Sequence, residues 1–166
     1  MLDFGHVRVS YVRIEDRPTT RPPSRAGAWI VESAGLRHLV DMEVQKAQRL
    51  RYSIALLCIA AGRNGAETEH SAASSLAERV TPLFRSTDAV AIWSPSTLAA
   101  MLVDAEIAHL PSIVDRLTTR LELYRWSAGG ACYPKTSTHA DELYDRAHDL
   151  MMQAERAGEN LLYLPS

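Results

Sequence analysis

The strongest constraint on the fold of this chain is a pair of short apolar segments joined by a tight polar turn, within residues 85–104. The apolar segments are 89–93 and 98–103, and Ser94-Pro95-Ser96 lies between them. Short apolar segments that flank Pro and Ser predict the two antiparallel strands of a β-hairpin. The turn itself carries no charge, and the nearest charged residues before it are Arg85 and Asp88.

Helical and strand patterns alternate along the rest of the chain. Apolar residues at helical spacing predict helices at 34–49, 71–84, 107–123 and 139–156. The predicted strands outside the hairpin are 52–61, 125–133 and 161–164. The segment 52–61 is apolar at almost every position, as expected of a central strand that is covered on both faces. This order predicts an α/β fold in which helices cover a mixed sheet of about five strands that includes the hairpin.

The N-terminal region has a different character. Residues 6–14 alternate between apolar and polar side chains, which predicts a half-buried or edge strand. Residues 15–27 are polar and contain three prolines, which predicts a loop or linker. We therefore expect two parts, an N-terminal strand with a linker rich in Pro and Arg over 1–33 and a folded domain over 34–166.

Composition narrows the class of protein further. The chain has 166 residues and a net charge of −2, so bulk electrostatics suggest no nucleic-acid partner. It has no apolar segment of membrane-spanning length and no signal-peptide pattern, and its two cysteines, Cys58 and Cys132, fall in predicted buried strands. We expect a cytoplasmic protein with free thiols. Its six histidines lack metal-ligand spacing, so we expect no metal site. We also expect no cofactor.

From about Gly35 to the C-terminus, the chain resembles the GGDEF domain, the palm-like domain of bacterial diguanylate cyclases. Two segments carry the resemblance, S-A-G-G-A-C-Y-P at 127–134 and H-A-D-E-L-Y-D-R-A-H-D-L-M-M-Q-A-E-R-A-G-E-N at 139–160. The family has a Ser-x-Gly-x-Ala strand, a Tyr-Pro turn and a helix that ends in Ala-Lys-x-x-Gly-x-Asn at these places. The resemblance implies a GGDEF-like palm fold.

The signature turn of that family is altered in this chain. It falls on Ser94, Pro95, Ser96, Thr97 and Leu98. In the family, glycines in this turn let the backbone approach a guanine nucleotide, and acidic residues hold metal and substrate. Pro95 has no N–H, and Ser96 and Thr97 supply no carboxylate. The turn is therefore expected to be degenerate.

Two further positions also lack the metal-binding or phosphate-binding residue that the family has there. The strand end at 58–61 reads Cys-Ile-Ala-Ala, where a cyclase has a Mg²⁺-binding Asp. Glu155 stands where the family has a phosphate-contacting Lys. Because two metal ions on a triphosphate need carboxylates to hold them, we expect no catalytic residues and no diguanylate cyclase activity.

An Arg-x-x-Asp motif is kept. In the family this motif lies five residues before the signature turn and binds cyclic di-GMP, and Arg85-Ser86-Thr87-Asp88 has the same spacing. A second arginine of that site falls on Arg116. Guanidinium groups can donate two hydrogen bonds to guanine or phosphate, and a carboxylate can accept from guanine. The resemblance thus implies a cyclic di-GMP site at Arg85, Asp88 and Arg116, although Arg and Asp at such a junction also commonly cap a turn.

Two hypotheses for the function follow. The first is a non-catalytic receptor for cyclic di-GMP that relays its signal to a protein partner. The second is an adaptor or dimerisation module that binds no ligand and keeps only the fold. Trp93, beside the altered turn, is either buried or a contact for a partner.

Overall fold

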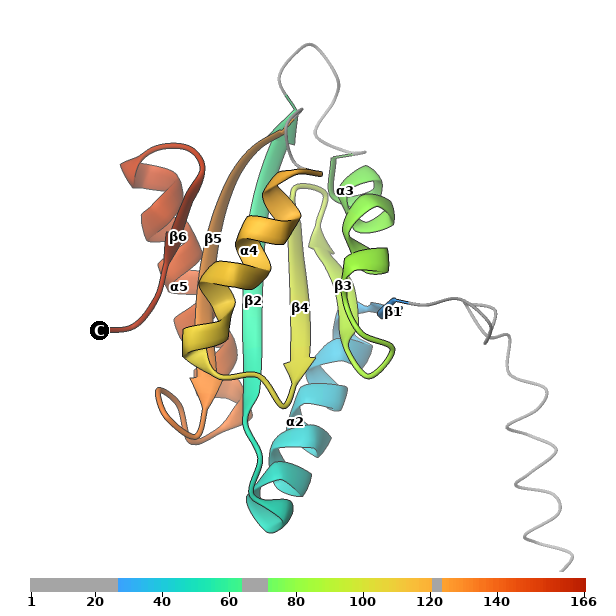
Figure 1. Ribbon diagram of the computed structural model, residues 1–166, viewed down its shortest axis with the longest axis vertical. Helices are drawn as coiled ribbons and strands as arrows, with labels where there is room; N and C mark the ends of the chain where they lie inside the picture. Colours follow the sequence, from blue (N-terminus) through green and yellow to red (C-terminus); the bar gives the residue numbers. More distant parts are fainter. Residues whose placement is uncertain (1–26, 64–71, 121–123) are drawn as a thin grey trace, which may run out of the picture.

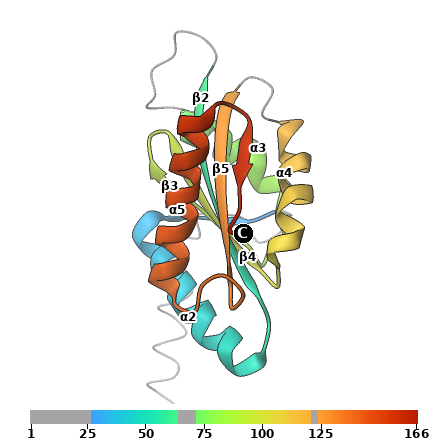
Figure 2. The same ribbon diagram turned by 90° about the vertical axis from the view of Figure 1, so that its left-hand side faces the viewer.

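The computed structural model describes residues 27–63, 72–120 and 124–166. These residues form one six-stranded sheet with helices on both of its faces (Figures 1 and 2). The strands are β1 (Trp29–Glu32), β2 (Ile54–Arg63), β3 (Ala89–Ser94), β4 (Thr97–Val103), β5 (Tyr124–Tyr133) and β6 (Leu161–Tyr163). The α-helices are α2 (Ser33–Leu50), α3 (Ala72–Val80), α4 (Leu110–Thr118) and α5 (Ala140–Ala157). Two 3₁₀ turns precede β3 and α4, namely η2 (Thr81–Leu83) and η3 (Ile107–His109).

The sheet is mixed, and β2 lies near its centre. The strand order is β1-β3-β4-β2-β5-β6, with β2 antiparallel to both β4 and β5. The hairpin of β3 and β4 is antiparallel, whereas β1 pairs in parallel with β3 and β6 in parallel with β5. The α/β fold with a mixed sheet and a central hairpin is therefore confirmed. The predicted strand at 6–14 lies outside the described residues.

The sheet has a sixth strand, β1, which was not predicted from the sequence. It has four residues and pairs with β3, which lies far along the chain. Trp29 N also donates a hydrogen bond to Asp88 O, with an N–O distance of 3.1 Å. Four residues are too few to show a recognisable alternation of apolar and polar side chains. The strand forms because it pairs with the edge of β3, a contact that depends on tertiary structure.

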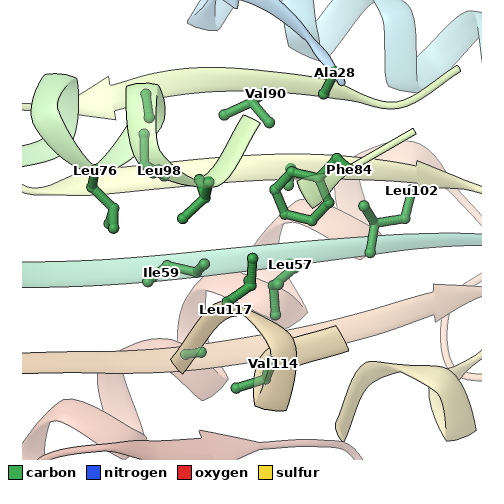
Figure 3. Close-up of a cluster of buried hydrophobic side chains, with 14 of the residues drawn as sticks. Ala28, Leu57, Ile59, Leu76, Phe84, Val90, Leu98, Leu102, Val114 and Leu117 are labelled. Carbon is green, nitrogen blue, oxygen red and sulfur yellow. The ribbon is translucent and has the colours of Figure 1, made fainter. Parts of the chain in front are cut away.

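Alternate residues of β2 enter two separate cores. Leu57 and Ile59 face α3 and α4, where they pack with residues such as Leu76 and Leu117 (Figure 3). Leu56 and Cys58 face α2 and α5. Successive side chains of a strand point to opposite faces, so a strand between two helical layers must be apolar throughout. This explains the continuous apolar sequence of β2.

Helix α5 packs unusually closely on β5. Its buried side chains recur at helical spacing, and it ends at Gly158, as its sequence predicts. Beneath it lies Gly129 of β5, where an added Cβ would lie 2.2 Å from Met151 N and 2.3 Å from Ala147 O. The helix backbone therefore rests directly on the strand backbone, which only glycine permits at this position.

None of the helices within the described residues is both long enough and apolar enough to cross a membrane.

Candidate functional site

Asp88 is a buried carboxylate that joins two parts of the backbone. It follows η2 and precedes β3, and it is only 3% exposed. Its Oδ2 accepts a hydrogen bond from Arg85 N at 2.9 Å, and its Oδ1 accepts one from Val103 N at 3.0 Å. Both carboxylate oxygens are thus engaged by backbone N–H groups. One of these groups belongs to the turn before β3 and the other to the last residue of β4.

Arg85 lies over the same junction but reaches solvent. Its side chain is 59% exposed, and its Nε lies 3.7 Å from Asp88 Oδ2. One guanidinium nitrogen donates a hydrogen bond to Val103 O. Arg85 and Asp88 together therefore fasten the start of β3 to the end of β4, while the guanidinium keeps an exposed surface. The structure brings these two predicted residues together.

Arg116, the third predicted member, is placed differently. It lies in the last turn of α4 and is exposed. Helix α4 begins near the end of β4 and runs toward the opposite end of the sheet, where β5 begins (Figure 1). Arg116 has no hydrogen bond or ion pair with Arg85 or Asp88 within the described part of the chain. The hydrogen bonds and distances therefore join Arg85 with Asp88, and the membership of Arg116 in the same site stays a prediction.

The turn between β3 and β4 is a two-residue hairpin connection. Strand β3 ends at Ser94 and β4 begins at Thr97, so Pro95 and Ser96 form the turn, while Leu98 is buried within β4. The turn's carbonyls are used internally, since Pro95 O accepts from Ala73 N at 3.0 Å and Ser96 O accepts from Ala61 N at 2.8 Å. The turn is held against the first residues of α3 and the end of β2.

The positions that the resemblance associates with catalysis do converge in space. A pocket of about 300 Å³ lies where β2, the hairpin turn and the end of α5 meet. Its lining includes Ala60, Ala61, Ser96 and Glu155. The end of β2 and the hairpin turn contribute no carboxylate to this pocket. These elements line it with alanine methyl groups and with the acidic Glu155 near the end of α5, and the hydroxyl-bearing residues of the lining are Ser96 and Ser127.

Sequence reasoning did not identify two charged residues of this pocket. Arg125 and Glu159 also line it, and Arg125 Nη1 lies 3.0 Å from Glu159 Oε1. Glu159 lies within the matched C-terminal segment, but its closeness to Arg125 depends on how β5 and the turn after α5 meet. Within the described residues, no group of three or more His, Cys, Asp or Glu side chains is placed to hold a metal ion.

Cys58 is the first residue of the segment 58–61, where the resemblance leads one to expect a metal-binding acid. It is fully buried on the face of β2 that α2 and α5 cover. Burial raises the pKa of this thiol to about 12. The side chain is therefore a neutral part of the core at physiological pH, and a metal needs a thiolate.

Trp93 packs against α5 and is partly buried. Its ring stacks on His148, with 5.3 Å between ring centroids, and meets the ring of Tyr144 edge to face at 5.1 Å. A bulge interrupts the pairing of β3 with β4 between Ile92 and Ser94. Much of the Trp93 ring thus contributes to internal packing. Whether its remaining surface contacts a partner stays a prediction.

The similarity to known proteins lies in the structure rather than in the sequence. Neither a protein-family model nor a curated protein matches the chain. The GGDEF domain of YfiN (TpbB) from Pseudomonas aeruginosa superposes with a TM-score of 0.74 at 19% identity, covering 82% of this chain and 96% of that one.

Two further solved structures have the same fold. The active GGEEF domain of a diguanylate cyclase from Vibrio cholerae has a TM-score of 0.71 at 13% identity, covering 80% of this chain and 96% of its own. A microbial GGDEF domain described in an interaction with cyclic di-GMP has a TM-score of 0.67 at 18% identity, with coverages of 81% and 94%. Residues of this chain thus adopt the fold of a GGDEF domain.

Proposed function

We propose that this chain is a non-catalytic regulatory domain of the GGDEF type. The observation that carries the proposal is the pocket between β2, the hairpin turn and α5. Ala60, Ala61 and Ser96 line it, and Glu155 adds negative charge at its far side. A triphosphate with two divalent metal ions needs carboxylates for the metals and cations for the phosphates. Ala60, Ala61 and Ser96 supply no carboxylate for the metals, and Glu155 supplies no cation for the phosphates. The Arg125 guanidinium in this pocket is already paired with Glu159.

The hairpin turn supports the same proposal. In a nucleotide site, a glycine-rich turn offers free backbone N–H groups and close approach. Here Pro95 has no N–H to offer, and the turn's two carbonyls accept hydrogen bonds from Ala73 and Ala61. Of the two turn residues, Pro95 thus has no N–H for a phosphate, and Ser96 N already donates to Ser94 Oγ at 3.4 Å.

Incubation of the purified chain with GTP and Mg²⁺, followed by chromatography for cyclic di-GMP and pyrophosphate, tests the absence of activity. We expect no product above a protein-free blank. Circular dichroism on the same sample must show a folded protein, so that inactivity is not the result of misfolding. Product formation that grows with protein concentration would contradict the proposal.

The effector that we propose is cyclic di-GMP, bound at the step formed by Arg85 and Asp88. The exposed guanidinium of Arg85 can donate two parallel hydrogen bonds to a guanine edge or a phosphate. Asp88 then acts by holding the turn, because its own oxygens are already engaged. Arg116 contributes only through a ligand long enough to extend along α4. The spacing of the motif before the hairpin turn supports this effector.

Calorimetric titration with cyclic di-GMP separates the roles of the arginines. We expect Arg85→Ala to weaken binding by about tenfold or more, because it removes a charge-assisted pair of hydrogen bonds. Arg116→Ala is expected to have a smaller effect. Arg49→Ala, in the exposed last turn of α2, is the matched control and should leave binding unchanged.

The alternative is an adaptor or dimerisation module that binds no ligand. The specific observation in its favour is that both carboxylate oxygens of Asp88 already accept hydrogen bonds from backbone N–H groups. The buried Asp88 therefore needs no ligand to satisfy its hydrogen bonding. The absence of heat with high micromolar cyclic di-GMP, or unchanged binding by Arg85→Ala, would exclude the receptor. Light scattering across a range of protein concentrations would then report whether the chain associates with itself.

A further inference from the structure

A groove of about 760 Å³ lies between α5 and the residues from the end of β6 onward, at one edge of the sheet (Figures 1 and 2). We call it the α5–β6 groove. Sites for organic ligands commonly measure about 300–1,000 Å³, so the groove can hold several side chains of a bound segment. It shares no lining residue with the pocket of Glu155 or with the Arg85–Asp88 step.

One wall of the α5–β6 groove is acidic. Glu142, Asp145 and Asp149 line it from one face of α5, and all three are exposed. Glu142 accepts a hydrogen bond from Thr138 N at 2.9 Å, whereas Asp145 and Asp149 have no hydrogen bond or ion pair with another described residue. Arg146 also lines the groove, but its guanidinium donates to a backbone carbonyl of the turn before α5. The wall therefore keeps a net negative charge.

The opposite wall is aromatic and apolar. Tyr163, the last residue of β6, and Pro165 line it, and Leu150 of α5 also contributes. All three are half-buried, so each keeps some surface toward solvent. Proline-rich segments in the polyproline II conformation dock into grooves with exposed aromatic rings. The groove thus suits a segment that carries both prolines and positive charges.

The chain itself contains a segment of this composition. Residues 17–25, R-P-T-T-R-P-P-S-R, have three arginines, three prolines and no acidic residue. Successive arginines are four positions apart, which corresponds to about 12 Å in polyproline II. Glu142 and Asp149 are seven positions apart on α5, which corresponds to about 10.5 Å along a helix. Two successive arginines can therefore reach the two ends of the acidic wall.

The segment cannot bind along the groove of its own copy. Strands β1 and β6 are the opposite edges of the sheet, and five strand spacings separate them by about 24 Å (Figure 1). Arg25 precedes Gly27 by two residues, which span at most about 7 Å. Gly27 lies just before β1, so residues 17–25 can lie in the groove only when they come from a second copy.

We propose that residues 17–25 of one copy bind the α5–β6 groove of a second copy. The arginines pair with the carboxylates of α5, and the prolines cover Tyr163 and Pro165. Reciprocal exchange of the segment closes a two-fold dimer, the commonest symmetry of homo-oligomers. This contact uses neither Arg85 nor Asp88, so it does not depend on cyclic di-GMP.

Light scattering of the full chain over a range of protein concentrations measures the association. We expect a dimer at low salt, with at least about tenfold weaker association in about 0.5 M salt, because exposed charge pairs are screened.

Charge reversal on each side identifies the two surfaces. The groove variant carries Asp145→Arg and Asp149→Arg, and the segment variant carries Arg21→Glu and Arg25→Glu. We expect each variant alone to associate at least about tenfold more weakly than the unaltered chain, because like charges then face each other. An equimolar mixture of the two variants should recover association, because each segment then meets a groove of opposite charge in the other variant.

Two controls accompany these variants. Asp41→Arg, at an exposed position of α2, should associate as the unaltered chain does. Circular dichroism checks that each variant is folded. If the groove variant is not, Asp145→Asn with Asp149→Asn removes the charge without adding bulk and should also weaken association.

Three outcomes would overturn the proposal. The first is a chain that stays monomeric up to millimolar concentration at low salt, which would leave the groove to a basic segment of another protein. The second is association that persists in the folded groove variant or in the segment variant, which would place the contact elsewhere. The third is a mixture of the two variants that associates no better than either variant alone.

Discussion

Replacement of Asp88 by alanine is the sharpest test of how this structure uses the pair formed by Arg85 and Asp88. The carboxylate accepts hydrogen bonds from Arg85 N and Val103 N and is 3% exposed. Alanine would leave two backbone N–H groups at this junction without their acceptor, at a cost of about 1–3 kcal/mol each. We therefore expect the free energy of unfolding to fall by roughly 4 kcal/mol, a large part of the 5–15 kcal/mol typical of a domain.

Urea unfolding followed by circular dichroism measures this loss. With a slope of about 2 kcal/mol per molar urea, the midpoint should fall by about 2 M. Asp88→Asn keeps one acceptor oxygen and should lose about half as much. The matched control is Asp145→Ala, an exposed aspartate of α5, which should change stability by no more than about 0.5 kcal/mol. A loss below about 1 kcal/mol in Asp88→Ala would refute the assignment of Asp88 as a structural clamp.

Three other predictions concern the core. Gly129→Ala should prevent native packing, because the new Cβ would lie 2.2 Å from a backbone nitrogen of α5, whereas Gly62→Ala, with no atom within 4 Å, should be tolerated; urea unfolding compares the two. Burial raises the pKa of Cys58 from 9.0 to about 12. The resulting contribution to the free energy of unfolding is fully present below pH 9 and is lost as the pH rises from 9 toward 12. Unfolding measured across this range should show a shallower alkaline decline in Cys58→Ala, and an unchanged decline would contradict the assignment. Trp93→Ala should destabilise the fold by about 2–3 kcal/mol through lost packing on α5, whereas Trp29→Ala, at a site 38% exposed, should cost less than about 1 kcal/mol; equal effects in thermal melts would count against the packing role of Trp93.

Much of the fold was accessible from the sequence because its signals are local. Helices α2 and α5 bury residues at helical spacing, and β2 is apolar along its length because both of its faces are covered. The hairpin was indicated by Pro95 and Ser96 between two apolar segments. Strand β1 was missed because its pairing with β3 is a long-range contact that leaves no periodic trace in four residues.

The candidate site was only partly accessible. The spacing of Arg85 and Asp88 identified the step. The sequence could not reveal that both side chains would hydrogen-bond to the backbone of Val103, which lies 15 residues after Asp88 and 18 after Arg85. Arg116 was associated with them by counting along the chain, and it lies in the last turn of α4 with no bond to Arg85 or Asp88 among the described residues. Arg37, Trp93 and Tyr144 meet only because α2, β3 and α5 pack together.

The sequence by itself therefore determined most of the helices and strands, and that the end of β2 and the hairpin turn carry no carboxylate. These properties depend on residue type and on neighbours within a few positions. The tertiary structure alone decided that Asp88 faces inward and that Arg85 reaches solvent. Burial and hydrogen-bond partners depend on which distant strand lies alongside, and that is set by the packing of the whole sheet between its two layers of helices.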